Sequence, residues 1–236
     1  GYTLLTINPT HTIQPARQAL PYDSMKSFTP IAKLGSGTMA LVVHPSLPVS
    51  SVKELVALAK QKPGQLPFAS PGSGSVVHMM AELFQMMNNI NFIMVQFKGG
   101  GAAIIDLLGG HSYAAINSLP QVLPHIKSGK LRVLGTGGSK RSALMPDVPT
   151  IAEAGVPGYE AAIWWGILAP AGVPASVVER LNGEIKAILA LDEVKKIFLN
   201  DGAEVDYRST TEFGPFLEKE MVQWARVIKK TKIKLE

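Results

Sequence analysis

The sequence predicts an α/β fold built around mainly parallel sheets. Short apolar runs, typical of strands, alternate along the chain with amphipathic helical patterns, and the connections between them are short. Some of the runs are continuously apolar, as expected for strands of a sheet that is covered on both faces. Ser51 with Glu54, and Thr150 with Glu153, form the capping-box pattern that begins a helix. We therefore expect right-handed strand–helix–strand units.

The first half of the chain alternates regularly between the two kinds of element. A polar connection is expected over 21–35. The expected strands cover 2–7, 39–45, 66–70, 92–97 and 112–117. The expected helices cover 52–62, 75–89, 101–110 and 119–129. The helix over 75–89 should bury one face, which consists of Val77, Met80, Leu83, Phe84 and Met87.

The second half continues the pattern with longer helices. Strands are expected at 131–137 and 161–170, and a short helix at 150–155. The helix that follows Pro174 and runs through Leu191 aligns on one face Val178, Leu181, Ile185 and Ile188. A last amphipathic helix begins at Ser209 and has an inner face of Phe213, Phe216, Leu217, Trp224 and Ile228.

Composition indicates a globular protein and limits its chemistry. The 236 residues are 46% hydrophobic and 17% charged, and no apolar run is long enough for a transmembrane helix. The absence of cysteine excludes disulfides, thiolate catalysis and zinc–cysteine sites. Much of the net charge of +5 comes from C-terminal lysines without interleaved aromatics, so no nucleic-acid partner is expected. The positive charge can attract organic anions.

A glycine-rich turn within 66–80 separates an expected strand from an expected helix. Amide groups at a helix N-terminus lack an intrahelical partner and carry partial positive charge, so they can bind an anion. Gly72 and Gly74 allow the backbone to approach a ligand closely. Hydroxyl donors come from Ser70, Ser73 and Ser75. His78 either contacts the ligand or packs at the helix surface, and the whole turn can alternatively be a simple helix cap.

The same turn lacks the motifs of nucleotide-binding and hydrolytic enzymes. A P-loop requires lysine after its last glycine, whereas Gly74 is followed by Ser75; the dinucleotide-binding motif requires glycine where Val77 stands. No serine has glycine two residues away on both sides, as the nucleophile elbow requires. The five histidines are scattered, with no pair four residues apart. We therefore expect no cofactor, no metal ion and no catalytic residue.

A second loop, 96–103, repeats the order of strand, glycines and helix. It is expected to leave unpaired the backbone N–H groups of Gly99, Gly100 and Gly101. Lys98 adds a positive charge, unless it is only a solvated loop lysine. A third strand end carries Asn117 and Ser118. Because α/β sheets bind ligands outside the carboxyl ends of their strands, these ends can converge on one anion.

Two adjacent tryptophans lie in the strand expected over 161–170. Trp164 and Trp165 point to opposite faces, so one can pack in the core while the other lines a cleft. The sequence leaves open which tryptophan faces the cleft, and Trp165 is included in the candidate ligand site.

Several segments of the chain, taken in order, match one known family. They are SPGSGSVVH, FKGGGAAIIDLLGG, LPHIKSGKLRVL, KRSALMPDVPTIAEAGVPGYE and WWGILAPAGVPASVVERLN. Together they closely resemble the solute-binding receptors of the tripartite tricarboxylate transporters, the Bug or TctC-like family. LPYDSMKSFTPIAKL and PSLPVSSVKELVALAK resemble earlier segments of the same family. No single motif would justify the resemblance, but it covers nearly the whole chain.

The resemblance implies a type II periplasmic binding protein with two α/β lobes. The lobes would be joined by two crossing strands near GSGTMALVV and IWWGILAP. Lobe one would comprise 1–39 and 163–236, and lobe two 40–162. Family members begin with strand–helix units and a glycine-containing loop that this chain lacks. Lobe one is therefore expected to be N-terminally truncated, to expose apolar edges and to bind its ligand weakly.

The resemblance also assigns candidate ligand contacts. From lobe two these are Ser70, Gly72, Gly74, Ser75, His78, Lys98, Gly99, Gly100, Gly101, Asn117 and Ser118. The remaining lobe-one polar contacts would be Thr6, Asn8 and Thr10. The chain departs from the family pattern at Val77, Phe97, Ala102, Asn117, Ser118 and Ile163. Several departures remove hydroxyls or a charge, which favours an acid less polar than citrate.

The expected function is a non-catalytic extracytoplasmic receptor in the periplasm. Its lobes would close around a small organic carboxylate, and the closed monomer would present a surface to the membrane components of a tripartite transporter. One alternative is the ligand-sensing domain of a regulator or signalling system with the same fold. Another is an enzyme on an α/β fold, although no convergent acid–base or nucleophile set is evident.

Overall fold

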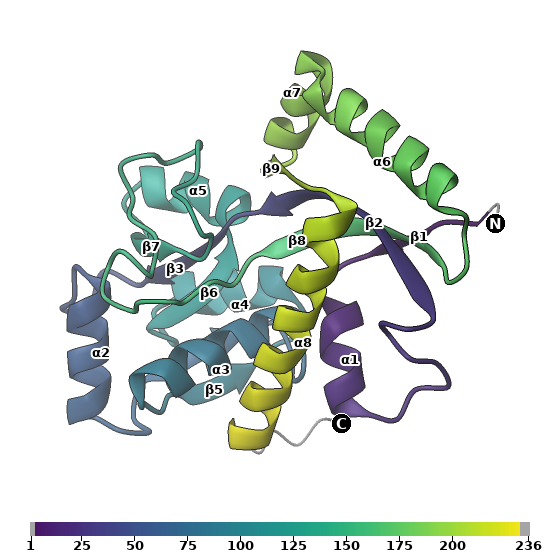
Figure 1. Ribbon diagram of the computed structural model, residues 1–236. Helices are drawn as coiled ribbons and strands as arrows, with labels where there is room; N and C mark the ends of the chain where they lie inside the picture. Colours follow the sequence, from purple (N-terminus) through teal and green to yellow (C-terminus); the bar gives the residue numbers. More distant parts are fainter. Residues whose placement is uncertain (1–2, 232–236) are drawn as a thin grey trace. The chain divides into compact units, whose positions relative to one another are not determined.

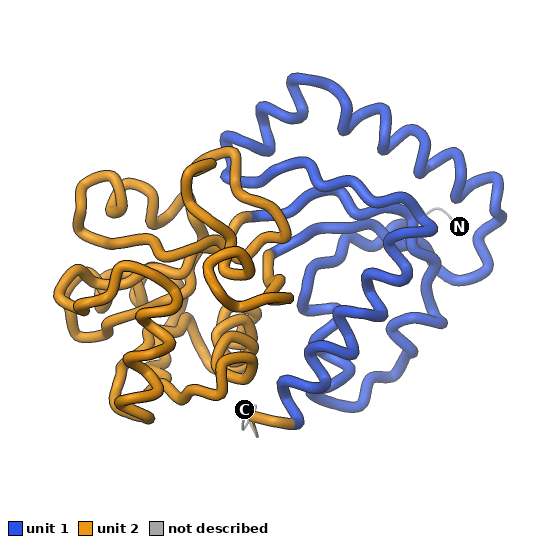
Figure 2. Tube along the Cα trace, turned by 60° about the vertical axis from the view of Figure 1, so that its left-hand side comes forward, with its two compact units in different colours: residues 1–37, 163–229 blue, residues 38–162, 230–236 orange. Residues whose placement is uncertain are grey.

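The computed structural model describes residues 3–231 and divides the chain into two compact units (Figures 1 and 2). Unit 1 comprises residues 1–37 and 163–229, and unit 2 comprises residues 38–162 and 230–236. Each unit contains its own sheet. Within the described residues, no helix combines the length and the apolar character that a membrane span requires.

Unit 1 is built on a four-stranded antiparallel sheet in the order β1-β8-β2-β9. Its strands are β1 (Leu5–Ile7), β2 (Phe28–Gly37), β8 (Ile163–Pro170) and β9 (Ala203–Arg208). Its helices are α1 (Pro9–Arg17), α6 (Ala175–Ala190), α7 (Asp192–Asn200) and α8 (Thr210–Thr231). Helices α6 and α7 lie on one side of this sheet, and α1 and α8 lie on the other (Figure 1).

The core of unit 1 is an aromatic cluster between β8 and α8. Trp164 is 2% exposed, and its ring meets the rings of Phe213 and Phe216 edge-on, with centroids 5.8 and 5.3 Å away. The indole Nε1 of Trp164 donates a hydrogen bond of 3.0 Å to Glu220 Oε2. Trp165 points to the other face of the strand and is only half-buried. Trp164 is therefore the tryptophan that packs in the core.

Unit 2 is built on a five-stranded mixed sheet in the order β5-β4-β6-β3-β7. Its strands are β3 (Met39–Val43), β4 (Pro67–Ser70), β5 (Ile93–Gln96), β6 (Ala114–Ser118) and β7 (Arg132–Thr136). Its helices are α2 (Val52–Gln61), α3 (Val76–Asn88), α4 (Gly100–Leu108) and α5 (Leu119–Lys127). Helices α4 and α5 bury aliphatic side chains against the sheet, including Ile104, Leu107 and Val122.

The predicted α/β fold class is confirmed, but the expected parallel strand pairing is wrong for most of the structure. Among the strand pairs of the described residues, only β4–β5 and β4–β6 are parallel. In unit 1, strand β2 leads out of the unit and β8 leads back into it. These neighbours therefore run in opposite directions.

Four elements were not predicted from the sequence. Most of β2 lies within the expected connection at 21–35, and α1, α7 and β9 were not anticipated. Helix α1 contains two prolines, which disfavour a helix in sequence reasoning, whereas the apolar face of α7, formed by Val194, Ile197 and Phe198, was overlooked. β1 forms one edge of its sheet, where Leu4 and Leu5 are 45% and 41% exposed.

Helix faces and one short helix also differ from expectation. Four residues expected on buried helix faces are not fully buried: Met87 and Ile188 are 37% and 51% exposed, and Val77 and Ile228 are only partly buried. In α6, Leu189 is buried instead of its neighbour Ile188.

The expected helix at 150–155 is a series of turns. Its capping-box hydrogen bonds nevertheless form, because Thr150 N–H donates to Glu153 Oε2 and Glu153 N–H to Thr150 Oγ1, each at 3.1 Å. Ala154 N–H donates to Thr150 O at 2.9 Å, and Gly155, with φ of +121°, ends the segment after this single turn.

Candidate anion site in unit 2

Three neighbouring strands of unit 2 bring their carboxyl ends to one edge of the sheet. β4 is parallel to both β5 and β6, and its last residue, Ser70, pairs with Gln96 of β5. β6 ends at Ser118. Each strand is followed by a helix, so the N-termini of α3, α4 and α5 begin near the same edge. This is the arrangement in which α/β sheets bind ligands.

Two backbone hydrogen bonds join the two glycine loops. Phe97 N–H donates to Ser70 O at 2.8 Å, and Gly99 N–H donates to Pro71 O at 3.2 Å. Gly72 and Gly99 have φ angles of +133° and +100°, which residues with a Cβ rarely adopt. Glycine is therefore required at these two positions by the course of the backbone.

The first loop is closed largely by its own groups. Ser75 is the N-cap of α3, and its Oγ accepts the N–H of His78 at 3.1 Å. Gly74 N–H donates to His78 Nδ1 at 2.9 Å, and Ser75 N–H donates to Gly72 O at 3.2 Å. The helix-cap role that the sequence left open is thus part of this loop.

One hydroxyl beside this loop is without a protein partner. Ser70 is 1% exposed, and its Oγ has no hydrogen-bond partner among the described residues. Because a buried hydroxyl is normally hydrogen-bonded, this oxygen is a candidate contact for a ligand or an ordered water.

The second loop begins a helix that no side chain caps. The N-cap of α4 is Gly99, which has no side chain to offer. The N–H groups of Gly100, Gly101 and Ala102 lie in the first turn, where a helix provides no acceptors. The expectation that all three glycines leave their N–H groups unpaired is wrong for Gly99, because its N–H is used by Pro71.

The end of β6 places an amide side chain beside α4. Asn117 is 5% exposed; its Nδ2 donates to Gly100 O at 3.4 Å, and its Oδ1 accepts the N–H of Ser118 at 2.8 Å. Ser118 is the N-cap of α5 but makes no side-chain cap bond. Sequence reasoning missed Gln121, whose Oε1 lies 3.5 Å from where a Cβ on Gly100 would stand. The spacing of Ser118 and Gln121, which matches a capping box, was the available signal.

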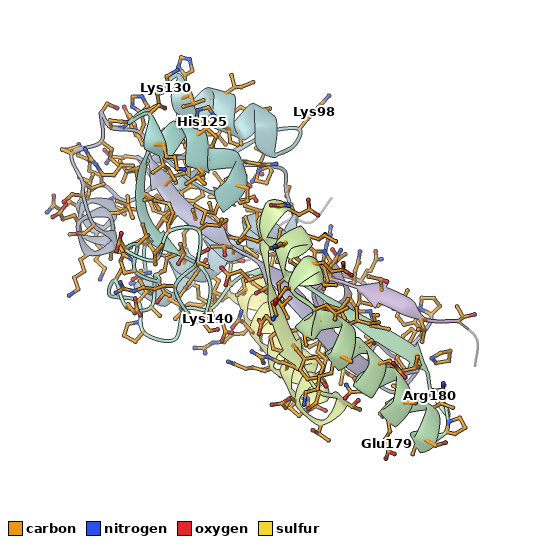
Figure 3. All side chains as sticks on the ribbon, turned by 90° about the horizontal axis from the view of Figure 1, so that it is seen from above. Lys98, His125, Lys130, Lys140, Glu179 and Arg180 are labelled. Atoms are coloured by element: carbon orange, nitrogen blue, oxygen red, sulfur yellow. The ribbon has the colours of Figure 1, made fainter. Side chains whose placement is uncertain are left out.

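The charged and the aromatic candidate belong to different units. Lys98 is exposed, and its side chain is directed away from the ribbon into solvent (Figure 3). In unit 1, Trp165 lines a surface cavity of about 260 Å³ together with Ile197, Phe198, Asp201 and Ala203. The ring of Trp165 therefore faces a cavity that is lined by residues of unit 1, most of them apolar.

The remaining unit 1 candidates lie around the start of α1. Thr6 and Thr10 are exposed, and Asn8 is the N-cap of α1, with its Oδ1 accepting the N–H of Thr10 at 2.9 Å. The structure thus brings together the eleven candidates of unit 2 around three strand ends. It places the four candidates of unit 1 in β1, at the start of α1 and in β8. No group of three acidic, histidine or cysteine side chains that could hold a metal occurs within residues 3–231.

Comparison with known proteins identifies the family. Residues 1–233 match the model of the tripartite tricarboxylate transporter family receptor, TctC. Protein BugT of Bordetella pertussis is 34% identical over 239 residues, which cover 100% of this chain and 73% of that protein.

Two solved structures extend the comparison. The structure of R. palustris Rpa4515 with adipate has 33% sequence identity and a TM-score of 0.77, covering 99% of this chain and 79% of that one. MatC from Rhodopseudomonas palustris, with bound malate, has 26% identity and a TM-score of 0.72, covering 95% and 78% of the two chains. The fold is that of periplasmic binding proteins of the TctC and Bug type, and the chain belongs to the tripartite tricarboxylate transporter receptor family.

Proposed function

We propose that this chain is a non-catalytic periplasmic receptor for a small organic carboxylate, which it delivers to the membrane components of a tripartite transporter. Adipate and malate are bound in two related structures, and both are dicarboxylates. Units 1 and 2 would act as the two lobes, and Thr6, Asn8, Thr10 and Trp165 would be the contributions of unit 1.

The observation that carries the proposal is the uncapped N-terminus of α4. Its first-turn N–H groups point along the helix axis with partial positive charge and lack a capping side chain. A carboxylate oxygen is the acceptor that such a helix start binds. The unpartnered hydroxyl of Ser70 and the amide of Asn117 supply further polar atoms near the same strand ends.

Binding by neutral donors explains how the receptor can work without a dedicated arginine or metal. Each N–H or hydroxyl replaces one water that solvates the carboxylate, and hydrogen bonds to a charged acceptor are stronger than neutral ones. Lys98, exposed at the loop, would contribute a long-range attraction that falls with ionic strength.

The experiment is calorimetric titration with adipate and malate, with adipamide as the neutral control of matched shape. We expect the acids to bind and adipamide not to bind. At 100 times its dissociation constant, a bound acid should also stabilise the chain by roughly 2.7 kcal/mol. Equal binding of adipate and adipamide would contradict a carboxylate site.

Two substitutions at Gly100 locate the site. A Cβ there would stand 3.5 Å from Asn117 Oδ1 and Gln121 Oε1, which is ordinary contact, so a side chain fits. Gly100→Asp places a carboxylate at the helix start, where it should support the helix but repel the ligand. Gly100→Asn is the neutral control of the same shape. We expect the aspartate variant alone to lose acid binding while it stays as stable as the asparagine variant.

A further inference from the structure

The side chain of His78 is buried inside the first glycine loop. It lies one turn into α3 and is 4% exposed. Its Nδ1 accepts the N–H of Gly74 at 2.9 Å, while its own backbone N–H donates to Ser75 Oγ at 3.1 Å. One residue therefore ties the helix to the loop through both its side chain and its backbone.

The hydrogen bond from Gly74 determines where the ring proton of His78 lies. A nitrogen that accepts a hydrogen bond carries no proton, so the neutral ring has its proton on Nε2. Nε2 lies 3.4 Å from Glu82 Oε1, one turn further along α3. The side chain of Glu82 is only 12% exposed, and its carboxylate favours a proton on the nitrogen that faces it. Glu82 was not singled out in the sequence, although its i, i+4 spacing from His78 was visible.

We propose that His78 is a positioning residue of the acid site, held in one tautomer by Glu82, and that it shapes the loop through Gly74 without touching the ligand. The inference rests on the proposed function, because it concerns how that site is held. Both ring nitrogens face protein groups, so neither is left to hydrogen-bond a ligand.

The loop has this contact with the His78 ring in addition to the hydrogen bonds of its own groups, and two of its residues are glycines with positive φ. Gly72 and Gly74 have φ angles of +133° and +69°, and neither has a side chain that could anchor the backbone. The Nδ1 of His78 accepts the N–H of Gly74 and so fixes the position of this glycine. Fixing the loop in turn places Pro71 O, which accepts the N–H of Gly99 at the start of α4. His78 is thus connected to the uncapped helix start through consecutive hydrogen-bonded loop residues.

Two substitutions separate this role from simple packing. In His78→Asn the side-chain oxygen can take the position of Nδ1 and accept the N–H of Gly74. In His78→Gln the amide reaches instead toward the position of Nε2 and Glu82. Both variants remove the ring and should lower the melting temperature by similar amounts. We expect His78→Asn to keep its adipate affinity within about threefold and His78→Gln to lose about tenfold, which corresponds to 1.4 kcal/mol. Equal affinities in the two variants would overturn the proposal.

A second measurement examines the ring of His78 directly in the wild-type protein. Nitrogen-15 chemical shifts of the His78 ring in the full chain should report a neutral ring protonated at Nε2, with Nδ1 unprotonated. A proton on Nδ1 would overturn the proposal even if the acid binds.

If wild-type protein binds neither adipate nor malate while the ring shows the expected tautomer, the proposed function fails and the local geometry stands. The amide resonance of Gly74 should then shift in His78→Gln and stay close to its wild-type position in His78→Asn.

Discussion

Each unit contains both capped and uncapped helices, and the start of α4 in unit 2 differs from two helix starts of unit 1, those of α1 and α8. In unit 1, Asn8 caps α1, and Pro9 follows with no N–H to offer. At the start of α8, Glu212 Oε2 accepts the N–H of Ser209 at 2.9 Å and its hydroxyl at 2.6 Å. In unit 2, α4 starts at Gly99 without any side-chain cap.

The difference shows what makes a helix start available to an external anion. The hydroxyl and then the N–H of Ser209 lower the pKa of Glu212, so α8 keeps a bound carboxylate of its own. Such a helix start is already occupied. The start of α4 is available because its N-cap is a glycine, and it lies at the end of β5 in the unit that contains the parallel strand pairs of the described residues. We expect the largest losses of stability at buried groups of unit 1 and the largest losses of affinity at the loops of unit 2.

The largest effect is expected from Trp164→Ala. Removing this fully buried ring leaves a cavity beside Phe213 and Phe216 and should lower the free energy of unfolding by about 3–5 kcal/mol. Trp165→Ala is the matched control; it removes a half-buried ring of the same strand and should cost only about 1–2 kcal/mol. Urea denaturation followed by circular dichroism measures both. Similar losses in the two variants would contradict the assignment of Trp164 to the core.

The next effect concerns a buried ion pair in unit 1. Lys33 is 3% exposed, and its Nζ contacts the carboxylate of Asp206. Burial alone would raise the pKa of Asp206, but the hydrogen bond and charge of Lys33 lower it overall. Lys33→Met should cost about 3 kcal/mol at neutral pH, because it leaves a partly buried carboxylate with only the hydrogen bond of Ser36 and the charge of Arg208 to compensate it.

Acid titration of the wild-type protein gives the sign of this contribution. The folded pKa of Asp206 lies below its unfolded value, so the pair stabilises the fold above the unfolded pKa. That stabilisation disappears as the pH falls through the folded pKa. Lys33→Met should therefore lose less stability on acidification than the wild type. The double variant Lys33→Met/Asp206→Asn should recover part of the loss at neutral pH. No recovery would mean that Lys33 acts by packing rather than by pairing.

A smaller effect distinguishes two neighbouring glycines of α4. No atom lies within 4 Å of a Cβ added to Gly99 or to Gly101, but only Gly99 has a positive φ, of +100°. Gly99→Ala should therefore cost about 1–2 kcal/mol through backbone strain alone and should lower acid affinity about tenfold, because it moves the start of α4. Gly101→Ala should leave both quantities nearly unchanged. Thermal unfolding and calorimetric titration of the pair provide the comparison, and equal behaviour would remove the backbone argument for this loop.

Sequence patterns predicted the part of the fold that depends on local signals. The strands and helices of unit 2 were found within a few residues because its runs are short, apolar and separated by capping or glycine signals, as at Ser51 and Ser75. β2 was missed because Pro30 and polar residues interrupt its apolar pattern. The antiparallel pairing of β2 with β8 could not be predicted, since it depends on where the chain leaves and re-enters unit 1.

The candidate site shows the same division between local and long-range information. The glycines and serines of the two loops were identified from residue type and spacing. The pairing of Gly99 N–H with Pro71 O, and of Gly74 N–H with the His78 ring, depends on the three-dimensional course of the loops. Residue type alone therefore overestimated the number of unpaired amides.

The smallest expected effect is also the most direct test of the comparison between the units. Asn8→Ala removes the cap of α1 and Ser75→Ala removes the cap of α3, and each should cost about 1 kcal/mol of stability. Ser75→Ala should also weaken adipate binding, because Ser75 belongs to the loop that holds the start of α4. Asn8→Ala should weaken binding less, because Asn8 would contribute a single polar contact from unit 1. A larger loss of affinity in Asn8→Ala than in Ser75→Ala would show that the start of α1, and not the loop before α4, supplies the main contacts to the acid.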